Sequence, residues 1–161
     1  MAVTFSDRER TKIIQSLRHA AARHSSLVGM RKTTVDELAG DAGISKGAFY
    51  KFYPSKESLF LDVLEQWYQS IYDRADQVLC DNLDKPPRER AALVMKAACR
   101  IIRTTPLVRF CLDDLPIALR KVPEMVAQKH YQNIDEFISS MIDRSQTSLT
   151  APKDEVCAAV K

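Results

Sequence analysis

The stretch "AGDAGISKGAFYKFY", residues 39–53, holds three of the four glycines of the chain, yet apolar residues recur at helical spacing on both sides of Gly43. Two helices that cross steeply over a tight turn need a residue that tolerates positive φ in the turn and a small residue at the crossing. Gly43 and Ala39 meet these needs. Three apolar residues can close the corner: Leu38, Ile44 and Phe49. The stretch therefore predicts a helix-turn-helix.

The second helix of this pair is expected to be short and to expose its polar side. Ser45 suits the N-cap, and the spacing predicts a helix from Lys46 to Phe52 with Phe49 and Phe52 turned inward. The outward-facing residues are then Lys46, Gly47, Tyr50 and Lys51. A slim helix with such a face can enter the major groove of DNA.

The rest of the chain also has the pattern of helices. Ser6 with Glu9 and Thr34 with Glu37 form capping boxes. Caps and apolar periodicity predict helices over about 7–25, 35–43, 56–79, 87–105 and 123–141, with one or two short helices after Pro106 and a last one beginning near residue 153. Strand-like alternation is not evident, so we expect an all-α protein.

Composition and charge narrow the class of protein. Of the 161 residues, 45% are apolar and 28% charged, and no apolar run is long enough to cross a membrane. No signal peptide is evident either, which favours the cytoplasm. Residues 1–60 hold ten Lys and Arg against six Asp and Glu, whereas 61–161 hold fourteen against fifteen. This asymmetry hints at an anionic partner for the N-terminal third.

The four cysteines are scattered and lack C-x-x-C spacing. We expect buried thiols rather than disulfides or a zinc site, and no metal or cofactor is indicated. The cysteines are Cys80, Cys99, Cys111 and Cys157.

The run "TTVDELAGDAGISKGAFYKFYPSKESLF", residues 33–60, resembles the signature of the tetracycline-repressor (TetR) family of bacterial transcription regulators. The resemblance covers about residues 7–65. One departure lies in "ARHSSLVGM", where the family usually has an aromatic residue near Ser25 and another just after Gly29; here Met30 follows the glycine.

The resemblance implies a fold and a function. Residues 1–54 would form a three-helix DNA-binding domain, with the helix-turn-helix at about 34–53. Helix four would join it to an antiparallel helical bundle of residues 55–161, which binds a ligand and dimerises. The family usually continues through two more helices, so the dimer residues cannot be assigned. The implied protein is a homodimeric repressor that a small, largely apolar effector releases from a palindromic double-stranded operator.

Roles in DNA binding carry over to matching positions. Thr34 and Ser45, at helix N-termini, would bind phosphates. Tyr50 would contact the DNA backbone, and Lys56 would bind a phosphate. The residues implied to lie along base edges are Lys46, Gly47, Ala48 and Lys51.

The effector cavity would be lined by apolar residues of the bundle, although the same stripe is also typical of a packed core. The candidates are Trp67, Ile71, Met95, Cys99, Phe110, Met125, His130, Phe137 and Met141. His130 could orient a ligand or be a hydrogen-bonded interior histidine. Its spacing to Asp135 and Glu136 argues against a metal site.

Two hypotheses of other classes, a protein-interaction module and an enzyme, compete with a DNA-binding regulator. In the first, the chain is a helical protein-interaction module whose helix-turn-helix no longer recognises DNA. Activation instead of repression is a variant of the regulator hypothesis. A small all-α enzyme is disfavoured because the sequence offers no phosphate-binding loop, metal set or catalytic triad.

Overall fold

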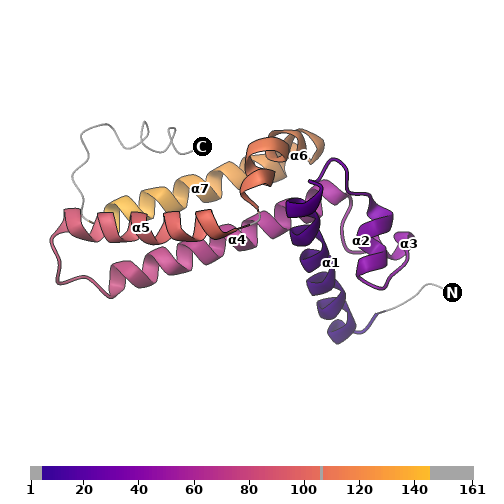
Figure 1. The fold of residues 1–161 in the computed structure, drawn as a ribbon, viewed down its shortest axis with the longest axis horizontal. Helices are drawn as coiled ribbons and strands as arrows, with labels where there is room; N and C mark the ends of the chain where they lie inside the picture. Colours follow the sequence, from indigo (N-terminus) through magenta and orange to yellow (C-terminus); the bar gives the residue numbers. More distant parts are fainter. Residues whose placement is uncertain (1–4, 106, 146–161) are drawn as a thin grey trace. The chain divides into compact units, whose positions relative to one another are not determined.

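The computed structural model describes residues 5–105 and 107–145, which form helices and connecting turns without strands. This confirms the all-α class. The helices are α1 (Asp7–Leu27), α2 (Val35–Asp41), α3 (Lys46–Phe49), α4 (Lys56–Cys80), α5 (Pro87–Thr104), the π-helix η1 (Phe110–Asp114), α6 (Leu115–Lys121) and α7 (Glu124–Ser145) (Figure 1). The helix expected near residue 153 lies outside the described residues.

The chain divides into two compact units. Unit 1 comprises Met1–Gln66 and Thr105–Pro123, and unit 2 comprises Trp67–Thr104 and Glu124–Lys161. Helix α4 contributes its first part to unit 1 and its second part to unit 2. The functional division between residues 54 and 55 stays a prediction.

Capping explains where the first two helices begin. The Ser6 hydroxyl accepts the N–H of Glu9, whose carboxylate in turn accepts the N–H of Ser6 at 2.8 Å. Thr34 and Glu37 make the same reciprocal pair at the start of α2. Both capping boxes predicted from the sequence are confirmed.

The core of unit 1 forms between α1, α2, α3, the first turns of α4 and residues 107–122. Phe49 of α3 is fully buried, and Phe60 of α4 lies against Phe110 of η1 with ring centroids 5.6 Å apart. Further buried apolar residues of this core are Leu17, Ala20, Ala21, Met30, Leu38, Ala39, Leu59, Leu61, Val63, Leu64, Leu107, Ala118, Leu119 and Val122. The apolar stripes predicted for α1, α2 and α4 therefore do face inward here.

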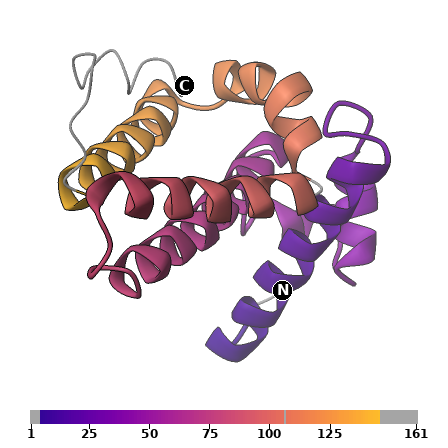
Figure 2. The same cartoon turned by 60° about the vertical axis from the view of Figure 1, so that its left-hand side comes forward.

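Unit 2 is built from the second part of α4 with α5 and α7. Helices α5 and α7 contact each other (Figure 2). Aromatic rings join α4 to α7: Tyr72 stacks on Phe137 with centroids 3.6 Å apart, and the rings of Tyr68 and His130 are 5.7 Å apart. His130 is only 3% exposed, as expected for an interior histidine.

The expectation of buried thiols is wrong for two cysteines. Cys80 and Cys99 are exposed free thiols, whereas Cys111 is half-buried. Cys99 shares the outer face of α5 with Met95 and Ile102, so its apolar neighbours in sequence do not enclose it. Cys157 lies outside the described residues. Within the described residues, no group of three His, Cys, Asp or Glu side chains could hold a metal ion.

Candidate nucleic-acid interface

The turn between α2 and α3 closes as a Schellman motif. Gly43 has φ +70°, the N–H of Ile44 donates to the carbonyl of Ala39 at 3.0 Å, and the N–H of Gly43 donates to that of Gly40 at 3.0 Å. Ala39 is 1% exposed and Leu38 is fully buried. A Cβ on Gly43 would meet no atom within 4 Å, so the glycine is required by its backbone angle and not by space. This turn and the two helices it joins, residues 35–49, are called the α2–α3 corner below.

Helix α3 presents its outer face to solvent. Ser45 caps it by accepting the N–H of Ala48 at 3.2 Å. Tyr50 is 52% exposed, and Lys51 and Gly47 are also exposed. A side chain added at Gly47 would meet no atom within 4 Å, so the backbone here is open to close approach by a large ligand.

The helix ends earlier than its sequence predicts, at Phe49 and not at Phe52. The N–H groups of Lys51 and Phe52 donate to carbonyls three residues back, at 3.0 and 2.9 Å, which tightens the chain into turns. Pro54 disfavours a helical conformation at Tyr53, so the helix does not resume after these turns. Phe52 is consequently half-buried.

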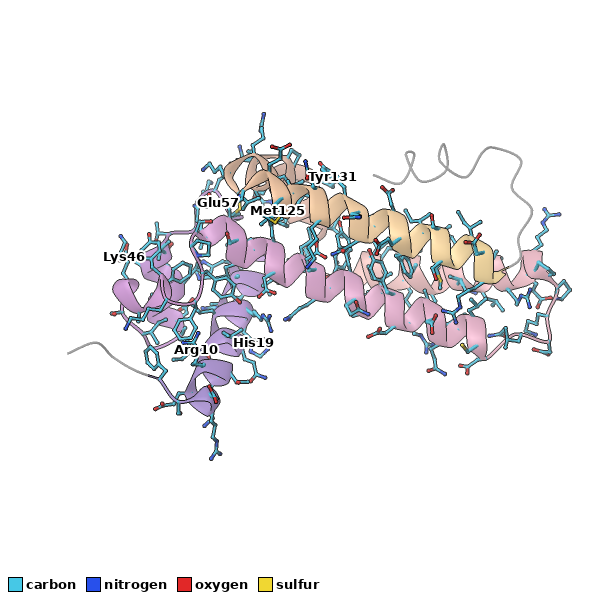
Figure 3. The ribbon with its side chains drawn as sticks, turned by 180° about the vertical axis from the view of Figure 1, so that it is seen from behind. Arg10, His19, Lys46, Glu57, Met125 and Tyr131 are labelled. Atoms are coloured by element: carbon cyan, nitrogen blue, oxygen red, sulfur yellow. The ribbon has the colours of Figure 1, made fainter. Side chains whose placement is uncertain are left out.

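The lysine at the start of α3 has an acidic partner within the corner. Lys46, labelled in Figure 3, donates from its ammonium to the Asp36 carboxylate of α2 at 2.7 Å, and both side chains are more than half exposed. This hydrogen bond, with the charge of Asp36, raises the pKa of Lys46. The side chain is therefore a cation at neutral pH, held over the outer surface of the corner.

The predicted phosphate contact of Thr34 competes with its capping role. Its N–H and its hydroxyl donate to the Glu37 carboxylate at 2.7 and 2.8 Å. The backbone hydrogen bond and then the hydroxyl lower the pKa of Glu37. Thr34 is exposed, so the contact stays a prediction that requires the hydroxyl to change partner.

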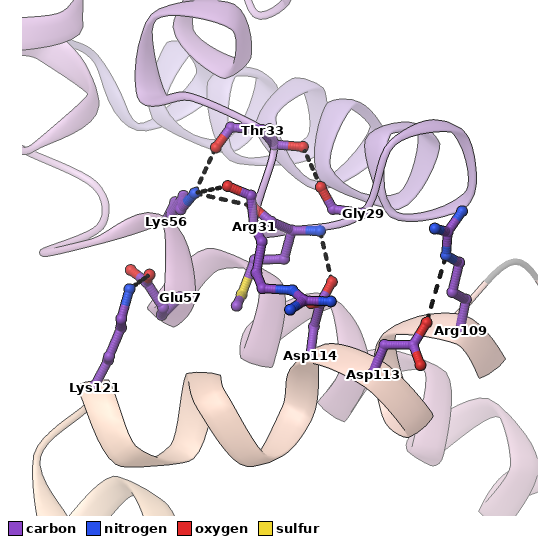
Figure 4. Close-up of polar contacts among 10 residues, drawn as sticks. Gly29, Arg31, Thr33, Lys56, Glu57, Arg109, Asp113, Asp114 and Lys121 are labelled. Carbon is purple, nitrogen blue, oxygen red and sulfur yellow. Dashed lines mark hydrogen bonds and ion pairs between the residues drawn. The ribbon is translucent and has the colours of Figure 1, made fainter.

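The family resemblance implies that Lys56 contacts a DNA phosphate, but in this structure its ammonium binds backbone carbonyls of the protein. Its ammonium donates to the carbonyls of Met30, Arg31 and Thr33 at 2.9, 3.2 and 2.6 Å (Figure 4). These residues belong to the connection between α1 and α2, called loop 28–34 below. The cation therefore holds the loop that leads into the α2–α3 corner. Its phosphate contact stays a prediction.

Sequence reasoning missed two residues beside α3. The rings of Phe5 and Phe52 are 5.5 Å apart, and the Lys51 ammonium lies 6.0 Å from the Phe5 ring. The Arg10 guanidinium lies 5.2 Å from the Phe52 ring on the same side of unit 1. The basic run "DRERTK" at the start of α1 was the available signal, but nothing in it shows which residues face α3.

A polar network fixes α1 against α4. Arg18 of α1 makes a two-pronged ion pair with Asp62 of α4, at 2.7 and 2.9 Å, and the Tyr53 hydroxyl donates to the same carboxylate at 2.5 Å. Burial, together with the hydrogen bond to Asp62 and its charge, raises the pKa of Tyr53. The phenol therefore stays protonated and keeps donating at any physiological pH.

The residues expected to line an effector cavity do not all come together. Phe110 lies in the core of unit 1, whereas the others belong to unit 2. Ile71 and His130 are buried there, and Trp67 is half-buried with an indole N–H that has no partner. Met95 and Met125 are 65% and 76% exposed, and Cys99 is exposed, so within the described residues none of these three lines an enclosed cavity.

Unit 2 does contain a groove between α4 and α7. Its volume is about 420 Å³, and its lining includes two of the expected residues, Phe137 and Met141. The other lining residues are Gln69, Tyr72, Asp73, Asp76, Gln77, Cys80, Ser140 and Arg144. Arg144 pairs with Asp76 across the groove. An aromatic floor with polar groups around it suits a small molecule that has an apolar body.

The sequence matches known proteins in its N-terminal part. Residues 17–63 match the model of the family described as bacterial regulatory proteins, tetR family. The chain is 39% identical over 61 residues to the uncharacterized HTH-type transcriptional regulator YerO of Bacillus subtilis (strain 168), covering 38% of this chain and 21% of that protein.

It is 33% identical over 86 residues to the nucleoid occlusion factor SlmA of Photorhabdus laumondii, covering 53% of this chain and 42% of that protein. The chain thus spans less than half the length of either relative.

A solved structure shares the fold. A Shewanella sp. PV-4 protein assigned to the tetR family of transcription regulators aligns with a TM-score of 0.70 at 20% identity, over 91% of this chain and 78% of that one. At this identity the likeness concerns the fold alone. Among the residues described, no helix is long and apolar enough to cross a membrane.

Proposed function

We infer from the match of its helix-turn-helix domain that the chain belongs to the TetR family of bacterial regulatory proteins, and we propose that it is a homodimeric, DNA-binding repressor. It binds a palindromic operator in the cytoplasm and releases it when a small, largely apolar molecule binds. We propose a regulator with no catalytic role.

The exposed basic surface formed by α3 and the turn after it is the observation that carries this proposal. Lys46 in α3 and the two residues just after the helix, Tyr50 and Lys51, are exposed. Leu38, Ala39 and Phe49 on the inner side of the corner are buried. Phosphate contacts made by such cations give affinity, and contacts to base edges give sequence preference. The glycine at position 47 lets the helix backbone approach the bases closely.

We propose dimerisation because the helix that would contact the bases, α3, is short. A helix as short as α3 reaches only a few base pairs, which is too small an interface for a specific operator. A two-fold dimer doubles the contact and makes the operator a palindrome, with half-sites one or more helical turns apart.

The groove between α4 and α7 is the proposed effector site. Tyr72, Phe137 and Met141 offer apolar contact to the body of a ligand, and the Asp76–Arg144 pair offers polar contact to its end. A ligand shifts the equilibrium only as far as its affinities for the two states differ, typically by about 1–3 kcal/mol.

Selection of bound duplexes from a random DNA pool tests the function directly. We expect a palindrome. Lys46→Ala and Lys51→Ala should each remove most of the preference for the selected duplex over an unrelated one, whereas Lys96→Ala, which removes an exposed charge of α5, should not. Equal enrichment of all sequences, or unchanged preference in both α3 variants, would refute a reading role.

A second candidate follows from the match to the nucleoid occlusion factor, which extends over 86 residues and thus beyond the helix-turn-helix. In this candidate the chain binds DNA for nucleoid occlusion, the role named for that relative, and not for transcriptional control. Purified chain and RNA polymerase separate the two functions: a repressor blocks transcription from a promoter that overlaps the selected palindrome without further protein. An activator would raise it.

A further inference from the structure

One buried carboxylate of unit 1 reaches the loop that precedes the α2–α3 corner. Asp114, the last residue of η1, is 2% exposed. Its Oδ2 accepts the N–H of Met30 at 2.8 Å, and its Oδ1 accepts Nε of Arg31 at 3.0 Å (Figure 4). Burial of a carboxylate is costly unless its oxygens are hydrogen-bonded, so these two donors are what make the position tenable.

Loop 28–34 is therefore held from two sides by opposite charges. The Asp114 carboxylate takes an N–H of the loop, while the Lys56 ammonium takes three of its carbonyls. Hydrogen bonds to charged groups are stronger than those between neutral groups. The loop ends at Thr34, the N-cap of α2, so these bonds hold the segment that leads into α2.

The segment that carries Asp114 is itself anchored. Lys121 at the end of α6 pairs with Glu57 of α4 at 3.2 Å, and Glu57 is 7% exposed. Phe110, four residues before Asp114, packs on Phe60 of the same helix. Asp114 thus reaches the loop from a support that is fixed to α4.

Gly29 shows how closely the loop fits the carboxylate. It has φ +82°, and a Cβ placed there would lie 3.2 Å from Oδ2 of Asp114. A glycine is needed both for the backbone angle and for the approach of the carboxylate to the next residue's N–H.

We propose that Asp114 is a positioning residue for DNA recognition: by holding Met30 and Arg31 it fixes loop 28–34, and so sets the orientation in which the α2–α3 corner meets the base pairs. The inference rests on the proposed function. Base contacts depend on orientation more than phosphate contacts do, because only the former require alignment with base edges. Loss of the carboxylate should therefore reduce sequence preference more than general DNA affinity.

Asp114→Asn tests this against Asp113→Asn, which makes the same chemical change at the exposed neighbour paired with Arg109. The probes are the duplex that the wild-type chain selects and an unrelated duplex of equal length. For Asp114→Asn we expect affinity for the selected duplex to fall about tenfold, the worth of one misplaced base contact, and affinity for the unrelated duplex to fall less than about twofold. Asp113→Asn should change neither.

Hydrogen exchange gives a readout independent of DNA. The Met30 amide should exchange faster in Asp114→Asn than in Asp113→Asn, at a urea-free condition where circular dichroism shows both variants folded. If Asp114→Asn does not fold, Arg31→Met decides instead, because it removes only the exposed donor; we expect it to lower the preference about threefold, as for a weakened charge-assisted hydrogen bond.

Two outcomes would overturn the inference. One is an unchanged ratio of affinities for the two duplexes in Asp114→Asn, whether both affinities stay the same or both fall by the same factor. Where only Arg31→Met folds, an unchanged ratio in that variant is the other. A wild-type chain that selects no sequence would refute the proposed function, and this inference with it, whereas selection by the wild type with an unchanged ratio in the variant refutes the inference alone.

Discussion

The two units differ in how much apolar surface they bury. Among the described residues, the buried apolar side chains belong to unit 1 except for Ile71, Ala75 and Leu79. Helices α5 and α7 instead expose large apolar side chains, including Met95 and Met125 at 65% and 76%. A helix with an apolar stripe folds stably only where a neighbour covers that stripe. Unit 1, which holds the α2–α3 corner, thus has its own interior, whereas the described residues of unit 2 bury few apolar side chains.

The largest expected effect comes from truncating one phenylalanine in each unit. Phe49→Ala opens a cavity in the core of unit 1 and should lower the free energy of unfolding by about 3–5 kcal/mol. Phe137→Ala removes a half-buried ring that stacks on Tyr72, and should cost about 1–2 kcal/mol. Urea denaturation followed by circular dichroism measures both. Equal losses would show that the contrast in burial does not reflect stability.

A second comparison concerns the loop. Lys56→Met keeps the aliphatic part of the side chain but leaves three carbonyls without their cation, so we expect unfolding free energy to fall by about 1.5–3 kcal/mol. Lys32→Met, on the exposed side of the same loop, should have little effect. If the variant at position 56 loses DNA affinity but keeps its urea midpoint, the residue serves a phosphate contact alone.

We expect the stability of the fold to depend on pH through Glu57, which is buried at the start of α4. Burial alone would raise the pKa of Glu57, but its hydrogen bonds to its own N–H and to Lys121, with the charges of Lys121 and Lys56, outweigh burial and lower it. A carboxyl whose pKa is lowered by folding stabilises the native state above its unfolded pKa of 4.5 and loses this contribution as pH falls through the folded value. Melting temperature should therefore fall less steeply below pH 4.5 in Glu57→Gln than in the wild type. Parallel curves would contradict this.

The smallest expected effect is a change in DNA affinity when an exposed acidic residue of the α2–α3 corner is removed. Asp36→Ala releases Lys46 and removes a negative charge beside the DNA-facing surface, so affinity for the selected duplex should rise about two- to fivefold at low salt, without a measurable shift in urea midpoint. Asp84→Ala, in the exposed connection between α4 and α5, is the control for charge alone. A fall in affinity would instead mean that Asp36 holds Lys46 in its productive position.

The helix-turn-helix could be predicted from sequence because its determinants are local. The positive φ of Gly43, the small Ala39 and the capping boxes act within a few residues of one another, and each is readable in the printed sequence. The end of α3 at Phe49 was not predicted, because Pro54 restricts only Tyr53 and the apolar spacing of Phe49 and Phe52 extends to residue 52.

The support of loop 28–34 could not be predicted in the same way. Asp114 lies 84 residues from Met30, and no pattern of charges in "LDDL" tells the buried Asp114 from the exposed Asp113. Periodicity likewise cannot show which stripe of α5 is covered. Met95 and Cys99 have the spacing of a buried face, and only the arrangement of neighbouring helices shows that they lie outside.

The anchoring of η1 and α6 to α4 has a consequence for chimeric regulators. A fusion that takes residues 1–66 from this chain and everything after them from another would strand the buried Glu57 carboxylate without Lys121, and would leave the peptide after Gly29 with no acceptor. The part that can be transferred is therefore discontinuous in sequence. A chimera must take residues 107–122 of this chain together with its N-terminal segment, and these residues must replace the recipient's segment between its fifth and seventh helices.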